Sequence, residues 1–168
     1  MVADNRASRV LVEPMSVIIP KIHSTPSEIL EALESRFGSL PASYKAFLDQ
    51  HDGAKPEKNT FKIDGQTNGS VRQFIPAADI IRVCNMVEGF PKNMLPFAED
   101  DVGNFMYLNP ANGAIHFWNH EVDDAEPKVA DSFEEFLTML EKFDIDQIKL
   151  KPGQVKRVWV DPTFKPEY

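Results

Sequence analysis

The sequence contains a single cysteine, Cys84, and this scarcity excludes two kinds of protein. One thiol cannot form a disulfide within the chain, and it supplies only one ligand of a cysteine-rich zinc site. The protein therefore fits a reducing compartment. Cys84 itself is expected to be a small hydrophobic residue of the core.

Long apolar runs are missing as well. No stretch approaches the roughly 20 apolar residues that a membrane-spanning helix requires. The apolar run at residues 15–19 is too short for the core of a signal peptide, and Glu13 and Pro14 interrupt what precedes it. Together with the single cysteine, these absences predict a cytoplasmic protein with no membrane partner.

Positive charge is scarce in residues 96–146, where thirteen Asp and Glu residues stand against two lysines, Lys128 and Lys142. This segment carries −11, and because the whole chain carries −8, the remainder carries +3. A nucleic-acid partner is disfavoured, since binding to phosphates needs a basic face. A basic protein surface is the partner that such a block of negative charge favours.

The short motifs of common enzymes are absent too. The chain has no Gly-x-Ser-x-Gly elbow, no Walker loop and no dinucleotide fingerprint, and residues 65–70 lack the lysine of a phosphate loop. The metalloprotease motif HExxH fails because Asp124 stands where the second histidine belongs. The sequence therefore predicts neither an enzyme nor a cofactor.

Three consecutive acids, Glu99, Asp100 and Asp101, do not fit a calcium loop. An EF-hand loop needs a glutamate at its twelfth position, and counting from any of the three acids reaches a different residue type. Adjacent carboxylates on a strand would also point to opposite faces. We interpret the acids either as a solvated connection between strands or as one edge of a charged binding face.

His116 and His120 are spaced as zinc ligands on a helix would be. The residues around them predict a strand instead, and two histidines four residues apart on a strand lie roughly 13 Å apart. No metal site is therefore expected. A hydrolase that uses the clustered carboxylates with His116 or His120 is the least favoured alternative, and Asp101→Asn would abolish its turnover.

Four helices are predicted from apolar residues that recur at helical spacing between capping residues and glycines. They are expected over residues 25–37, 40–52, 77–88 and 131–143. Thr25 and Asp131 begin capping patterns and are expected to cap the first and the last helix. Phe143 is expected on the apolar face of the last one.

Short alternating or apolar segments predict strands. They are expected at residues 59–63, 71–75, 94–98, 104–108 and 114–118, with residues 155–160 as a further candidate. Residues 64–70 are expected to form the turn between the first two strands. The connections in the later meander have hairpin length, which favours one domain of the α+β class with a largely antiparallel sheet and helices on one face. Trp118 either packs in the core or anchors a partner.

Four motifs occur in the order and at the spacing of a known family. They are Leu40-Pro41-x-x-Tyr44-x-x-Phe47-Leu48 ending near Gly53, Leu95-Pro96-Phe97-Ala98 followed by acids and Gly103-Asn104, Gly113-x-Ile115-x-Phe117-Trp118-x-His120-Glu121, and Ser132-Phe133-Glu134-Glu135-Phe136-Leu137. Over residues 25–143 the chain thus resembles the SUKH superfamily, which includes Smi/Knr-type fungal cell-wall-assembly regulators and many bacterial immunity proteins. Residues 1–24 and 147–168 are extensions outside the match, and residues 51–54 depart from the family's Asn-Gly-Gly ending.

The resemblance implies a SUKH-like fold and a function without catalysis. It implies an immunity protein that binds and neutralises a cognate polymorphic or contact-dependent bacterial toxin, often a nuclease; the alternative is a regulatory scaffold of the Smi/Knr type that binds several cellular proteins. The family motif residues then belong to the scaffold of the fold. They are Leu40, Pro41, Tyr44, Phe47, Leu48, Gly53, Pro96, Phe97, Gly103, Asn104 and Trp118.

The acidic segment is the predicted binding face for a protein partner with a basic surface. Its candidate residues are Glu99, Asp100, Asp101, Glu121, Asp123, Asp124 and Glu126. Charge complementarity would supply association rate and specificity, while a few anchor residues would supply most of the affinity. Exposed strand edges leave open whether the protein is a monomer or a weak homodimer.

Overall fold

The computed structural model describes residues 24–65, 67–122 and 126–143, together with Gly153 and Thr163. The apolar run at residues 15–19 and the candidate strand at residues 155–160 lie outside these residues. In the part of the chain that is described, none of the helices has the length and apolar character needed to cross a membrane.

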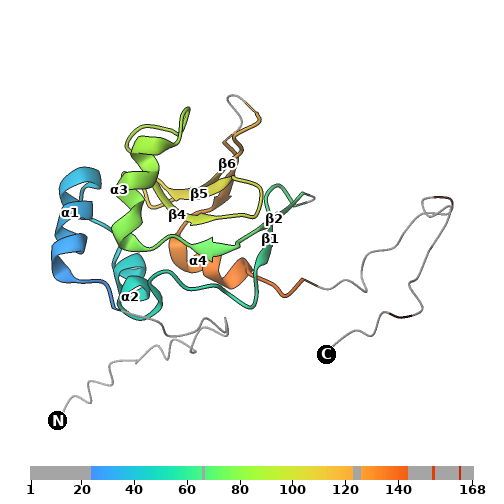
Figure 1. Cartoon of the computed structure of the whole chain (residues 1–168), viewed down its shortest axis with the longest axis horizontal. Coiled ribbons are helices and arrows are strands. Elements are labelled where there is room, and N and C mark those ends of the chain that lie inside the picture. Colours follow the sequence, from blue (N-terminus) through green and yellow to red (C-terminus); the bar gives the residue numbers. More distant parts are fainter. Residues whose placement is uncertain (1–23, 66, 123–125, 144–152, 154–162, 164–168) are drawn as a thin grey trace, which may run out of the picture.

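The described residues form four helices and seven strands (Figure 1). The helices are α1 (Ser27–Phe37), α2 (Ala42–His51), α3 (Ala77–Met86) and α4 (Phe133–Met139). The strands are β1 (Thr60–Lys62), β2 (Asn68–Ser70), β3 (Gln73–Phe74), β4 (Leu95–Glu99), β5 (Phe105–Leu108), β6 (Ile115–Trp118) and β7 (Lys128–Ala130). The predicted α+β class is confirmed.

The larger sheet has five antiparallel strands in the order β3-β4-β5-β6-β7. Its centre, β4 to β6, is the meander that the sequence predicts, and the register pairs Phe105 with Trp118 and Tyr107 with His116. The edge strand β7 was not predicted. Its three residues are too few to produce a recognisable alternation, and pairing with β6 places them in the sheet.

The smaller sheet corrects the predicted first hairpin. β1 pairs with β2, which lies inside the expected turn at residues 64–70, whereas Gln73 and Phe74 pair with β4 in the larger sheet. Gly69 explains the tighter pairing, because a Cβ added there would lie 2.5 Å from Cζ of Phe61. The missing side chain allows the Phe61 ring to lie across β2 and reach the core.

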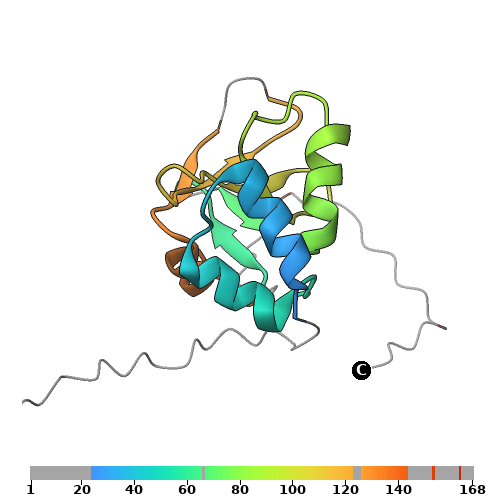
Figure 2. The same cartoon turned by 90° about the vertical axis from the view of Figure 1, so that its left-hand side faces the viewer.

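The four described helices lie in two pairs around the larger sheet. Helices α2 and α4 pack against one face, where rings from Tyr44, Phe47, Phe97, Phe133 and Phe136 contact one another at their edges. Figure 2 shows α1 and α3 side by side beside the sheet. The prediction of helices over one face thus holds for α2 and α4.

The other face of β5 and β6 is covered by a loop residue. Phe90 follows α3, and its ring lies 5.9 Å from Phe105, 5.8 Å from Tyr107 and 5.5 Å from Trp118. Cys84, at the end of α3, is half-buried and packs against the core, and this burial raises the pKa of its thiol. Both faces of the central strands are therefore apolar, which explains why β5 is buried along its whole length.

The predicted cap of α1 is wrong. Pro26 occupies the N-cap position, and the Thr25 hydroxyl instead donates a hydrogen bond of 2.8 Å to Oδ2 of Asp52. The other carboxylate oxygen of Asp52 accepts from the backbone N–H of Ala77, at 2.7 Å. Asp52 therefore joins the chain before α1 to the first turn of α3, where negative charge is favourable.

The cap of α4 lies one residue later than predicted. Oγ of Ser132, and not the side chain of Asp131, accepts a hydrogen bond of 3.1 Å from the backbone N–H of Glu135. The Glu135 carboxylate reaches back to the backbone N–H of Asp131. The helix ends at Met139, so Phe143 lies beyond its apolar face and is exposed.

A buried hydroxyl in the aromatic core gives a first prediction. The Tyr44 hydroxyl has no hydrogen-bond partner among the described residues, and burial raises the pKa of this side chain far above its usual value. Because an unpaired buried polar group is destabilising, we expect Tyr44→Phe to raise the free energy of unfolding by about 1 kcal/mol. Urea denaturation followed by circular dichroism measures the change.

Tyr107→Phe is the matched control, because the Tyr107 hydroxyl donates a hydrogen bond to the Glu126 carboxylate. Removing this partnered hydroxyl should lower the free energy of unfolding by about 1 kcal/mol. If Tyr44→Phe were destabilising to the same extent as Tyr107→Phe, the Tyr44 hydroxyl would have a partner in solution and the prediction would be wrong.

Candidate binding face

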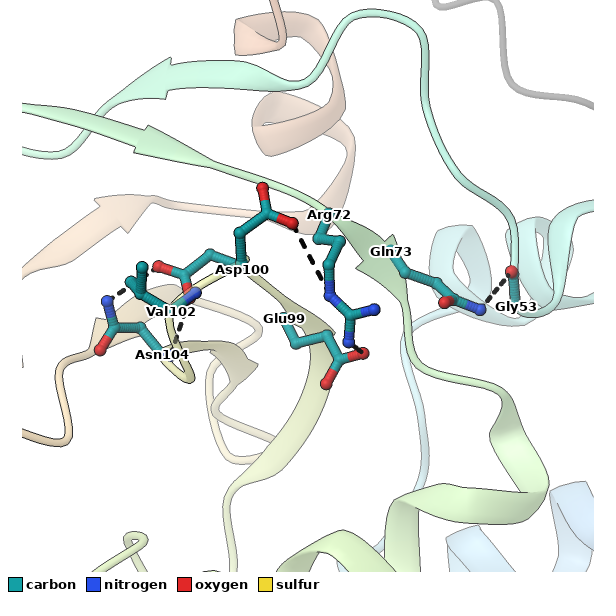
Figure 3. A network of polar contacts seen from close by, with 8 residues as sticks. Gly53, Arg72, Gln73, Glu99, Asp100, Val102 and Asn104 are labelled. Carbon is teal, nitrogen blue, oxygen red and sulfur yellow. Dashed lines mark hydrogen bonds and ion pairs between the residues drawn. The ribbon is translucent and has the colours of Figure 1, made fainter.

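The connection between β4 and β5 is organised by the carboxylate of Asp100. Its Oδ1 accepts hydrogen bonds from the backbone N–H groups of Val102, at 2.9 Å, and Asn104, at 2.8 Å. Its Oδ2 accepts from Nδ2 of Asn104, also at 2.8 Å (Figure 3). Asp100 is only 7% exposed, so it shapes the turn from within. This corrects the expectation that Asp100 belongs to an exposed acidic face.

The acids on either side of Asp100 face a base from the neighbouring strand region. Arg72 forms an ion pair with Glu99 (Figure 3). Its Nε also lies 4.0 Å from Oδ1 of Asp101. The Asp101 side chain is nevertheless 71% exposed, so water screens its long contact with Arg72 strongly. Of the three consecutive acids, Asp101 therefore presents the most accessible charge to a partner.

Asn104 connects this turn to the connection between β6 and β7. While its Nδ2 donates to Asp100, its Oδ1 lies 2.9 Å from Nδ1 of His120 and accepts from the His120 backbone N–H at 3.3 Å. The next residue, Glu121, is exposed, and its backbone N–H donates to Oδ1 of Asn119. Asp101 and Glu121 thus lie on two adjoining connections.

Glu126 lies beside β6, in a pocket lining that it shares with Trp118 and His120. The Tyr107 hydroxyl donates to its Oε2, and Nδ1 of His116 lies 3.0 Å from its backbone oxygen. The rings of Tyr107 and His116 stack with centroids 5.2 Å apart. Burial first, and then the Glu126 carboxylate, raise the pKa of Tyr107 well above its usual value, which keeps this hydroxyl a donor.

Two predicted members of the face, Asp123 and Asp124, lie outside the described residues. His116 and His120 have separate partners, the backbone oxygen of Glu126 and the side chain of Asn104. Within residues 24–65, 67–122 and 126–143, no group of three or more His, Cys, Asp or Glu side chains is arranged to hold a metal ion.

The motif residues lie in the core or at turns. Leu40, Tyr44, Phe47, Leu48, Pro96, Phe97, Asn104 and Trp118 are buried, and Pro41 precedes α2 as its N-cap residue. Gly53 and Gly103 have φ of +72° and +95°, a region that glycine enters readily. The Gly53 backbone oxygen also accepts a hydrogen bond from Gln73 (Figure 3), which ties the end of α2 to β3.

No pattern in the sequence predicts the pocket that lies next to this face. A cavity of about 330 Å³ lies between the segment that follows α3 and the connection after β6. Its walls include Glu88, Gly89, Trp118, Asn119, His120 and Glu126. The sequence does not identify Glu88, because only the packing of the loop after α3 against β6 brings this residue into the same pocket lining as Glu126. No local pattern encodes that contact.

Two comparisons place the chain among known proteins. Residues 25–139 match the SMI1/KNR4 family (SUKH-1), and the matched segment contains the four described helices and all the candidate residues of the binding face. The chain is also similar to the SPbeta prophage-derived uncharacterized protein YokK of Bacillus subtilis (strain 168), at 28% identity over 154 residues. That alignment covers 76% of this chain and 80% of the other protein.

Proposed function

The chain belongs to the SMI1/KNR4 family (SUKH-1), and from this premise we propose that it is an immunity protein that binds and neutralises a cognate bacterial toxin. The family includes toxin immunity proteins. The protein acts in the cytoplasm by occupying a surface that the toxin needs, and it carries out no chemical step of its own. A nuclease, whose substrate-binding surface is basic, is the kind of toxin that fits best.

The observation that carries this proposal is the exposed negative charge on two adjoining connections. Asp101 and Glu121 are exposed, and Glu126 adds a third exposed carboxylate, in a pocket lining that it shares with Trp118 and His120. Arg72 offsets only part of this charge, because it pairs with Glu99. A face of this kind attracts a basic partner from a distance and disfavours acidic ones.

The fixed geometry of the face supports a binding role. Asp100 and Asn104 connect the backbone of one turn to His120 in the other through hydrogen bonds of 2.8–3.3 Å. A surface that is ordered before association loses less conformational freedom on binding. The acids therefore meet a partner with little rearrangement of the backbone that holds them.

Co-expression with the product of the neighbouring gene tests the proposal. We expect the cell to survive a toxin that otherwise kills it, and the two proteins to elute together as one complex. Absence of both protection and complex would overturn the proposed immunity function. Recovery of several weakly bound cellular proteins in place of one tight partner would favour the regulatory scaffold instead.

Charge reversal then tests the acidic face. We expect the double variant Asp101→Lys/Glu121→Lys to associate with the toxin at least about tenfold more slowly, with the wild-type rate falling as salt is raised. The matched control is Glu31→Lys/Asp49→Lys, which makes the same change of charge at exposed positions on α1 and α2. Equal rates for the two double variants would place the interface on another surface.

A further inference from the structure

The pocket beside the binding face combines an aromatic wall with two carboxylates. Glu88 comes from the end of the α3 region, Trp118 from β6 and Glu126 from the start of the segment leading into β7. We propose that this pocket receives an arginine side chain of the partner. The inference rests on the proposed function in one respect, namely that the partner is a protein. The pocket would then supply the anchor, and the surrounding acids the long-range attraction.

The charge of the pocket fits a cation. Its lining contains Glu88 and Glu126 and, among the described residues, neither lysine nor arginine. One oxygen of Glu126 accepts from the Tyr107 hydroxyl, which fixes the orientation of this carboxylate. A planar guanidinium can donate parallel hydrogen bonds to carboxylates, and this pairing is stronger and more specific than the point contact of an ammonium group.

Trp118 supplies the aromatic wall. The residue is 8% exposed, and Phe90 and Phe105 hold its indole from the core side with ring centroids 5.5 Å and 5.9 Å away. Gly89 lines the pocket beside the indole, where a Cβ would lie 3.9 Å from Cζ2, in ordinary van der Waals contact. A guanidinium is attracted to the π-system of tryptophan and is more easily desolvated than an ammonium group.

The rim and the volume of the pocket suit the methylene chain of an arginine. Val122 is exposed at the rim of the pocket and offers an apolar contact to the methylene groups of an arginine. The volume of about 330 Å³ lies at the lower end of the range of roughly 300–1,000 Å³ typical of small-molecule sites. One long side chain, inserted from a partner surface, matches these dimensions better than a large ligand does.

A titration of the full chain tests the pocket without any toxin. The probe is Nα-acetyl-arginine amide, and the readout is the NMR signal of the Trp118 indole N–H, which Trp159→Phe distinguishes from the other tryptophan. We expect a saturable shift with a dissociation constant in roughly the millimolar range, as befits one isolated side chain. The uncharged isostere Nα-acetyl-citrulline amide should bind at least about tenfold more weakly.

Two variants and a control complete the experiment. Glu88→Gln and Glu126→Gln replace exposed acids, and each should weaken arginine binding roughly three- to tenfold, whereas Glu31→Gln on α1 should leave it unchanged. Equal shifts with the citrulline compound, or unaltered affinity in both pocket variants, would overturn the inference. Arginine binding without protection from a toxin would contradict the proposed function alone, and protection without arginine binding would contradict this inference alone.

Discussion

Replacing Phe97 by alanine is expected to lower the free energy of unfolding by about 3–5 kcal/mol. Phe97 lies in β4 and is fully buried, with its ring 5.3–6.4 Å from four other aromatic rings. These rings belong to Tyr44, Phe74, Phe133 and Phe136, and so come from α2, β3 and α4. Each is held by further aromatic contacts, so the surroundings cannot collapse into the cavity that alanine leaves.

Phe143→Ala is the matched control for this prediction, because it deletes the same atoms from a side chain that is 54% exposed. Its effect should stay within about 0.5 kcal/mol, as is usual for surface substitutions. Urea denaturation followed by circular dichroism, with both variants measured at the same pH and temperature, gives the comparison. Similar losses for the two variants would show that Phe97 is not at the centre of the core.

The central meander was predictable because its signals are local. The strands β4, β5 and β6 are short apolar segments buried on both faces, and the connection at residues 109–113 contains proline, asparagine and glycine. In this connection, Oδ1 of Asn109 accepts from the N–H of Ala111, and Oδ1 of Asn112 accepts from that of Ala114. Side chains that bond their own backbone leave a recognisable pattern in the sequence.

The first hairpin was predicted with the wrong partners because the deciding contact is not local. Residues 59–63 and 71–75 have similar strand signals, and nothing in them tells which sheet each joins. Two contacts determine which sheet each segment joins: the close approach of Phe61 to Gly69 and the pairing of β3 with β4. The glycine that favoured a turn at this position is the residue over which the aromatic ring packs.

The binding face also combines a local contact, which the sequence could indicate, with a distant one, which it could not. In the sequence Glu99, Asp100 and Asp101 are three equivalent acids, whereas in the fold one pairs with Arg72, one is buried and one is exposed. The partner of Asp100 lies four residues away, so a turn could have been suspected from Asn104. The partner of Glu99 lies 27 residues away, and its role appears only when β3 pairs with β4.

Asp100→Ala is expected to lower the free energy of unfolding by about 2–4 kcal/mol, an effect far larger than a surface acid would give. The substitution removes the acceptor of three hydrogen bonds and leaves three buried or partly buried donors without it, the backbone N–H groups of Val102 and Asn104 and the Nδ2 of Asn104. Asp101→Ala is the control, since its side chain is 71% exposed and its contact with Arg72 is 4.0 Å long. The urea midpoint of each variant measures the difference.

Asp100→Asn separates the contributions of these hydrogen bonds. An asparagine keeps an acceptor for the backbone N–H groups of Val102 and Asn104, but it sets an NH₂ group against Nδ2 of Asn104, where two donors cannot pair. Its loss of stability should therefore be intermediate, about 1–2 kcal/mol. Because Asn104 also holds His120, both variants should shift the NMR signals of the His120 ring, whereas Asp101→Ala should not. If Asp100→Ala unfolded at the same urea concentration as Asp101→Ala, Asp100 would be a surface charge after all, and the connection between the two acidic turns would depend on other contacts.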